Sequence, residues 1–109
     1  MENELSTVEQ RLIEGQAAEA IRTCYDPEIP VNIFDLGLIY EVKANEKGEV
    51  HIVMTLTSPH CPAAQVLPKE VETKVQAVPG VRGVHVEVTW TPGWNPSMMS
   101  EAAKLELGF

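Results

Sequence analysis

The residue types in this chain that could carry chemistry gather in two short segments. The first is TLTSPHCPAAQ, residues 55–65, which contains one of the two cysteines, Cys61, directly after His60 and between Pro59 and Pro62. Thiolate is the form of cysteine that attacks electrophiles and binds metals. The segment could therefore supply a nucleophile or a metal ligand. The alternative interpretation of Cys61 is a small buried side chain at the start of a helix.

The predicted position of Cys61 favours the thiolate. It follows a predicted strand and opens a predicted helix, where the positive end of the helix dipole stabilises a negative charge. The neighbouring prolines stiffen the loop that presents it. His60 lies in an extended segment, so its side chain is either a second ligand or base beside the thiol, or a surface or capping group on the other side.

The second segment, DPEIPVNIFDLGLI at residues 26–39, carries the carboxylates of Asp26, Glu28 and Asp35. One interpretation is turn chemistry, in which Asp26 starts a turn before proline and Asp35 caps a bend. The other follows from topology, because a helix end that feeds the first strand and a helix start that leaves the second can lie at one edge of the sheet. A carboxylate beside a thiolate raises the thiol pKa unless a cation lies between them, so the two together indicate a metal.

The remaining candidates have more ordinary interpretations. Cys24 lies on the apolar stripe of the first predicted helix and is expected in the core, whereas His51 and His85 alternate with apolar neighbours and are expected half-exposed on the sheet. Trp90 and Trp94 flank a proline–glycine turn, and we interpret them as lids over the core rather than as a binding platform. The chain has no CxxC, GxxxxGK[ST], GxGxxG or HExxH motif, so motif-defined redox, nucleotide and zinc-protease functions have no support.

Composition is typical of a soluble globular protein of one domain, with 109 residues, 44% hydrophobic and 22% charged. The net charge of −8 and the lack of a basic cluster argue against a nucleic acid partner. No apolar run approaches the roughly 20 residues of a membrane span, and the acidic start MENE is unlike a targeting peptide. We therefore expect a cytoplasmic protein with no membrane partner and with reduced thiols.

The elements that must position these residues follow from hydrophobic periodicity and turn residues. They are predicted, in the order helix, strand, strand, helix, strand, short helix, at residues 6–25, 36–44, 50–57, 61–78, 84–90 and from about Ser97. In the first helix, apolar residues recur every three or four positions from Val8 and Leu12 onward, and STVE at residues 6–9 fits a capping box. Gly37 indicates a bulge or a close backbone approach. Pro68 either kinks the second helix or marks its true start.

These elements predict an α/β (α+β) fold in a small single domain of residues 1–109. The turn NEKGE joins the first two strands into a hairpin, and the helix between the second and third strands is a crossover, which makes those two strands parallel. The result is a mixed three-stranded sheet with helices mainly on one face. Residues 1–6 are expected to be flexible, and residues 97–109 to form the C-terminal helix and tail.

Four stretches, DPEIPVNIFDLGLIY, TLTSPHCPAA, VPGV and VTWTPGWNPSMMS, together resemble the SufT-type proteins of the iron–sulfur cluster assembly domain family, whose relatives include PaaD and the cytosolic iron–sulfur targeting factors. The resemblance covers about residues 20–109. It implies a non-enzymatic accessory factor, related to the SUF system, with iron–sulfur assembly proteins and client apo-proteins as partners. It also implies Cys61 as the main cluster or metal ligand and Asp26 as a second position. His60 is a weaker candidate because it lies beside the thiol in sequence.

The number of thiols limits how a cluster could be held. Iron–sulfur clusters usually take four protein ligands, mostly thiolates, and this chain offers one plausible exposed thiol. A bound iron–sulfur cluster or iron is therefore expected to be transient and shared. Either two chains of a homodimer each contribute Cys61, with Asp26 or His60 completing the set, or a client protein supplies the missing ligands. A third alternative is a protein that binds no cluster and works by docking.

Two other functions stay open at this point. An enzyme would use Cys61 as a nucleophile, helped by His60 or Asp26. A non-catalytic interaction module would use the apolar surface of residues 90–100, from WTPGW to MMS. The binding or structural positions of that region and of the DLGL segment are Asp35, Trp90 and Trp94. The family resemblance favours the maturation factor over both.

Overall fold

The structure is a computed structural model that describes residues 4–26, 29–57 and 63–108. Its elements, in chain order, are α1 (Thr7–Ile21), β1 (Ile39–Ala44), β2 (Glu49–Met54), α2 (Ala63–Gln76), β3 (Gly83–Val88), the 3-10 turn η1 (Pro96–Met98) and α3 (Glu101–Leu107). The predicted order of helices and strands is confirmed, with η1 as an addition. No helix in the described part of the chain is long and apolar enough to cross a membrane.

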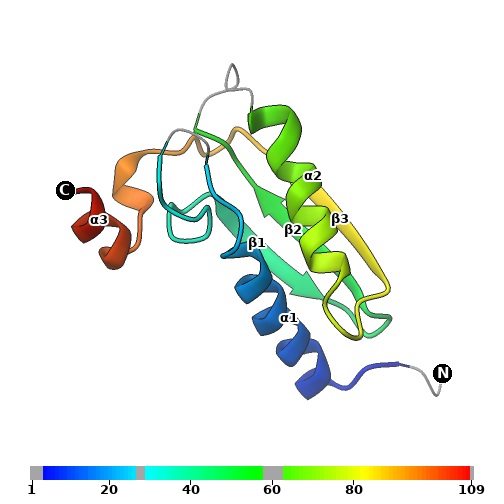
Figure 1. Cartoon of the computed structure of the whole chain (residues 1–109). Coiled ribbons are helices and arrows are strands. Elements are labelled where there is room, and N and C mark those ends of the chain that lie inside the picture. Colours follow the sequence, from blue (N-terminus) through cyan, green and yellow to red (C-terminus); the bar gives the residue numbers. More distant parts are fainter. Residues whose placement is uncertain (1–3, 27–28, 58–62, 109) are drawn as a thin grey trace.

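The three strands form one sheet in the order β1-β2-β3 (Figure 1). β1 and β2 are an antiparallel hairpin, and β2 and β3 pair in parallel, with Glu49 opposite Gly83 and Met54 opposite Val88. α2 makes the crossover from β2 to β3, so the predicted mixed sheet is confirmed.

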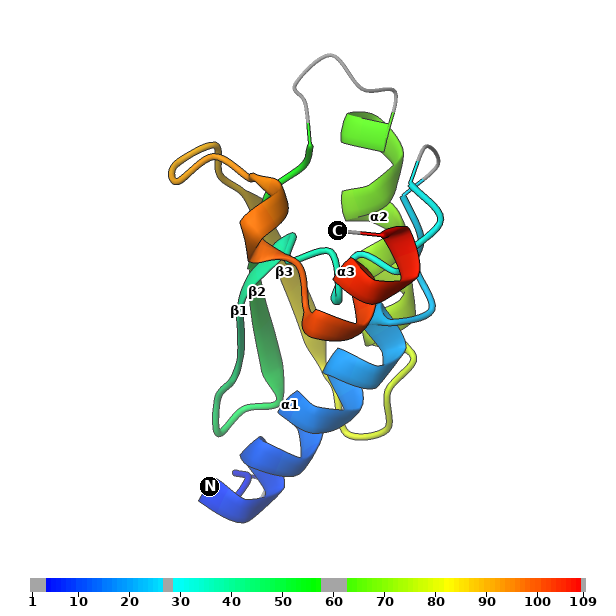
Figure 2. The same cartoon turned by 90° about the vertical axis from the view of Figure 1, so that its left-hand side faces the viewer.

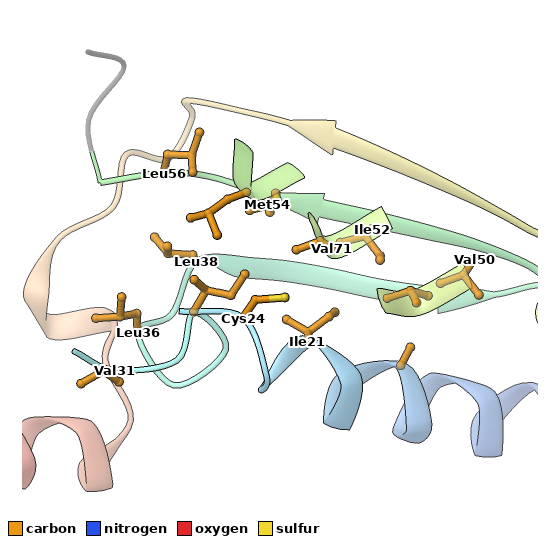
Figure 3. Close-up of a cluster of buried hydrophobic side chains, with 14 of the residues drawn as sticks. Ile21, Cys24, Val31, Leu36, Leu38, Val50, Ile52, Met54, Leu56 and Val71 are labelled. Carbon is orange, nitrogen blue, oxygen red and sulfur yellow. The ribbon is translucent and has the colours of Figure 1, made fainter. Parts of the chain in front are cut away.

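Helices α1 and α2 cover one face of this sheet (Figures 1 and 2), and the core lies between them and the strands. On β2, the buried side chains of Val50, Ile52 and Met54 alternate with partly exposed ones, as a strand with one covered face requires. Figure 3 shows these residues packed with side chains from the α1–β1 connection and α2. The expected α+β architecture with helices mainly on one face is therefore confirmed.

Helix α1 begins at the predicted capping box. The Oγ of Ser6 accepts a hydrogen bond from the backbone N–H of Glu9, and the Glu9 carboxylate accepts one from the Ser6 N–H. The predicted apolar stripe is wrong at its start, because Val8 is 78% and Leu12 59% exposed. Ile13, the neighbour of Leu12, is buried, so the cause is direction around the helix: residues four apart share one side of a helix, and the side of Val8 and Leu12 is not the buried side of Ile13.

Strand β1 begins at Ile39 rather than at Leu36, because residues 32–38 form successive turns. Gly37 has a φ of +86°, in the left-handed region that favours glycine. A Cβ at Gly37 would lie 2.4 Å from the carbonyl oxygen of Met98. The predicted close backbone approach is therefore present, and it is an approach to the C-terminal segment.

The other element ends also differ from the predictions. α2 begins at Ala63 and runs through Pro68. The last helix begins at Glu101, not near Ser97, with the Ser100 hydroxyl accepting a hydrogen bond from the third residue of α3. The Ser100 N–H donates to the carbonyl of Asp35 over 2.8 Å, which holds the chain extended between η1 and α3.

Candidate functional site

Four segments meet at one end of the molecule (Figures 1 and 2): the α1–β1 connection, the chain that leaves β2, the start of α2 and the chain that leaves β3. The parallel pairing of β2 and β3 brings their exits to the same edge of the sheet. Cys61 and His60 lie outside the described residues. The predicted convergence of the two chemistry-bearing segments therefore stays a prediction.

Asp26 lies in the α1–β1 connection and is 4% exposed. Its Oδ1 accepts a hydrogen bond of 3.0 Å from the backbone N–H of Ile29, which is the turn chemistry expected of an aspartate before proline. Burial and this bond orient the carboxylate. Its approach to Cys61 stays a prediction.

Asp35 stabilises the turn that precedes β1 through hydrogen bonds with Asn32. Its Oδ2 accepts from the side-chain amide of Asn32 over 2.9 Å, and the Asn32 side-chain oxygen accepts from the Asp35 N–H. The Arg22 guanidinium lies 3.9 Å from Oδ1 of Asp35 and 4.5 Å from the centre of the Phe34 ring. These contacts place Asp35 in the bend before β1, and a binding role for it stays a prediction.

The two tryptophans have different surroundings. The indole N–H of Trp94 donates to the carbonyl of Leu36 over 2.6 Å, and its ring packs against the core, as predicted for a lid. Trp90 is 45% exposed, so the prediction that it also covers the core is wrong. It stands after the end of β3, where the sheet no longer provides a covering layer.

Tyr40 is a position that sequence reasoning missed. Its hydroxyl donates to the carbonyl of Pro92 over 2.7 Å and so joins β1 to the segment between the two tryptophans. The register of β1 against β2 shifts between Ile39 and Glu41, which places Tyr40 at an irregularity in the strand. No local pattern signals this contact, because its partner lies far along the chain.

Cys24 is fully buried, among the core residues shown in Figure 3. Burial, with a smaller contribution from the negative charge of Glu70, raises the pKa of its thiol from 9.0 to about 11. The thiol is therefore protonated near neutral pH and enclosed, which confirms the predicted core role. Of the two cysteines, this leaves Cys61 as the candidate for chemistry.

We expect one fast thiol per native chain in a reaction with the soluble reagent DTNB at pH 8. Cys24 should stay unreacted because a pKa of about 11 leaves little thiolate and because the side chain is buried. Absorbance of the released thiolate measures the rate and the stoichiometry. Cys24→Ala should keep the fast phase, Cys61→Ser should remove it, and denaturant should release the second thiol. Two fast thiols in the native wild type would contradict this assignment.

Among the residues that the structure describes, no group of three or more His, Cys, Asp or Glu side chains is already arranged to hold a metal ion. The chain has two cysteines, and the core encloses one of them, Cys24.

Comparison with known proteins gives a consistent result. Residues 14–88 match the family model described as "Iron-sulfur cluster assembly protein". The chain is 50% identical to the Fe-S protein maturation auxiliary factor of Porphyromonas gingivalis over 109 residues, 100% of this chain and 99% of the relative. It is 42% identical to the Fe-S protein maturation auxiliary factor YitW of Bacillus subtilis, over 82% of this chain and 87% of the relative.

The fold has a counterpart among solved structures. The crystal structure of a domain of unknown function, DUF59, from Bacillus anthracis superimposes with a TM-score of 0.89 at 35% sequence identity, covering 95% of this chain and 99% of that one. The arrangement of two helices on a mixed three-stranded sheet, followed by a packed C-terminal segment, is therefore shared beyond this chain.

Proposed function

Because this chain belongs to the iron–sulfur cluster assembly protein family, we propose that it is a non-enzymatic accessory factor that assists the assembly or transfer of iron–sulfur clusters to client proteins. The observation that carries the proposal is the match to an Fe-S protein maturation auxiliary factor over the full length of both chains at 50% identity. We place the activity in the cytoplasm, where thiols stay reduced and free to bind iron.

The cluster is the cargo of this factor, and Cys61 is its proposed contact. Supporting this, Cys61 follows β2 and directly precedes the segment that opens α2, and the second cysteine, Cys24, is enclosed with its pKa raised. Asp26 and His60 are proposed as weaker ligands beside it. With one available thiol per chain, the remaining ligands come from a second chain in a homodimer or from the client. Such a shared site binds weakly enough to release its cargo.

Anaerobic reconstitution with iron and sulfide tests the proposed ligand. Wild type and Cys24→Ala are expected to develop charge-transfer absorption in the visible region, with no more than one cluster per two chains by iron and sulfide analysis. Cys61→Ser should lose at least about nine-tenths of the bound iron, because a serine hydroxyl is not deprotonated near neutral pH and is a poor iron ligand. Undiminished iron binding by Cys61→Ser would contradict the ligand role.

Docking without cluster binding is the second candidate, and exposed apolar side chains favour it. Tyr25, Val66 and Trp90 are 56%, 62% and 45% exposed. They belong respectively to the α1–β1 connection, the first turns of α2 and the chain after β3, three of the segments that meet at the end of the molecule described above. Large exposed apolar and aromatic side chains are typical anchors of protein interfaces. They could bind a client whether or not a cluster is present.

A further inference from the structure

In the described part of the chain, the two edges of the sheet differ in how they are protected. Along β1, Oε2 of Glu14 from α1 accepts a hydrogen bond of 2.9 Å from the outward backbone N–H of Ala44, and the strand register is interrupted between Ile39 and Glu41. Covered or irregular edges resist the addition of a further strand. β3 forms the other edge (Figure 1), pairs with β2 without interruption and contains neither proline nor lysine.

Every second residue of β3 points its backbone groups away from β2. The N–H of Thr89, directly after the strand, donates to the carbonyl of Met54 at the end of β2 over 2.8 Å. The direction of N–H and C=O groups alternates along a strand, so the even-numbered residues of β3 face outward. Among the described residues, no group forms a hydrogen bond with these outward N–H and C=O groups. The outward-facing residues are Val84, Val86 and Val88.

The side chains of these three valines are only partly buried, although they pack against the core. Their partners in register on β2, which are Val50, Ile52 and Met54, are at most 1% exposed. The difference arises because β2 has a neighbouring strand on both sides, whereas β3 has one on a single side. A strand added to the outer side of β3 would remove the exposed apolar surface of the valines from water.

The side chains along β3 complement those of a second, reversed copy of the strand. Residues 84–88 read Val-His-Val-Glu-Val. In an antiparallel pair centred on Val86, His85 of each copy lies opposite Glu87 of the other, and Val84 lies opposite Val88. An imidazole thus faces a carboxylate on one side of the sheet, and valines face valines on the other, and such cross-strand pairs favour association. Moving the centre to Glu87 would place two carboxylates opposite each other, which disfavours that register.

The backbone groups fit the same register. Residues opposite each other in an antiparallel pair alternate between hydrogen-bonded and non-hydrogen-bonded pairs. With Val86 at the centre, the valines form the hydrogen-bonded pairs, so each outward N–H and C=O obtains a partner. His85 and Glu87 form the non-hydrogen-bonded pairs, in which side chains lie closest. Glu87 already contacts His51 of its own chain at 3.2 Å, and a carboxylate can accept several hydrogen bonds.

We propose that two copies of this chain pair through the free edges of β3, antiparallel about Val86, and join their sheets into one. The helices of both copies then lie on the same face of the joined sheet, because the valines of the two strands share that face. The ends at which β2 and β3 leave the sheet point in opposite directions. This interface would form the homodimer named in the proposed function, and it requires no bound cluster.

Sedimentation velocity of full-length Cys61→Ser measures this association without thiol-linked dimers. About 0.15 M NaCl screens the repulsion between two copies with a net charge of −8 each. A small interface gives a weak dimer, so we expect monomer at about 1 µM and mostly dimer at about 1 mM. A protein that stays monomeric at about 1 mM would overturn the second copy as the occupant, and an extended segment of a client protein would then be the candidate.

Two charge variants in the same background test the register. His85→Glu and Glu87→Lys each lose the complementary pairs and should weaken self-association at least about tenfold. Mixed in equal amounts, the two variants should form a heterodimer, because the new carboxylate of one lies opposite the new ammonium group of the other. Glu41→Lys is the matched control, since it makes the same charge change beside His51 but on β1, and it should leave association unchanged. Failure of the mixture to associate would contradict this register.

Amide hydrogen exchange followed by NMR identifies the paired edge. The N–H groups of Val84, Val86 and Val88 should become protected only as the protein concentration rises. Those of His85 and Glu87 face β2 and should be protected at every concentration. If the protein dimerises while exchange at the three valines does not change, another surface forms the dimer and the proposal is wrong. Because the Cys61 thiol is absent throughout, these outcomes do not depend on the proposed cluster role.

Discussion

Replacing Cys61 by serine is expected to abolish the support that this protein gives to the maturation of iron–sulfur enzymes in cells. The thiolate is the proposed contact to the cluster, and Cys24 cannot replace it from within the core. In a strain that depends on this factor, the activity of a client enzyme should fall to the level without the factor. Enzyme activity with the protein level measured in parallel is the readout.

Two controls separate the ligand role from docking. Cys24→Ala should keep client maturation, because that side chain packs in the core and a small apolar residue replaces it. Trp90→Ala changes an exposed anchor. It is preferred to Trp94→Ala, because the Trp94 N–H bond to Leu36 holds the fold. If Cys61→Ser matures clients normally while Trp90→Ala does not, the protein acts by docking and the ligand role is wrong.

Gly37→Ala is expected to give the largest loss of stability. The φ of +86° strains any L side chain, at a cost of about 1–3 kcal/mol. The new Cβ would also lie 2.4 Å from the Met98 carbonyl oxygen, which is backbone and cannot rotate away. Forcing these segments apart should cost about 1–3 kcal/mol more. Small proteins typically have a free energy of unfolding of about 5–15 kcal/mol, so this loss is a large part of the total. The urea concentration at the midpoint of unfolding, followed by circular dichroism, should fall markedly.

Gly108→Ala is the control that measures the cost of backbone strain without a clash between the new Cβ and another segment. Gly108 has a similar φ of +83°, and a Cβ there would meet nothing within 4 Å. Its replacement should therefore cost only the strain, about 1–3 kcal/mol. Equal losses for the two variants would show that the approach of Met98 to Gly37 contributes nothing. Trp94 fluorescence should also change in Gly37→Ala, because the segment that carries Trp94 would separate from Leu36.

The predictions that held rest on interactions between near neighbours in sequence. The capping box at Ser6 joins residues three apart, the NEKGE turn closes a hairpin, and the alternation of β3 marks its buried face. Cys24 lies in the core as its spacing from Ile13, Ala17 and Ile21 predicts, although α1 ends at Ile21 and Cys24 belongs to the turn that follows it. A crossover helix between two strands of one sheet favours parallel pairing, so the topology followed as well.

The predictions that failed depend on contacts between distant segments. Leu36 has the apolar character of a strand residue, yet it lies in a turn held by Trp94 and next to the Gly37–Met98 approach. The last helix begins late because Ser100 is bonded to Asp35. Val8 and Trp90 have apolar side chains, yet both are exposed, because burial depends on which other segments pack against each side chain.

The sequence by itself determined the order of elements, the mixed sheet, the core thiol and the family, whereas Cys61 and Asp26 as positions for iron chemistry stay predictions. These follow from local periodicity and from motifs. The tertiary structure alone decided that the C-terminal segment docks on the DLGL turn and that His51 stacks on His85 between two carboxylates. Such contacts depend on strand register and on packing between residues far apart in the chain, which local patterns do not encode.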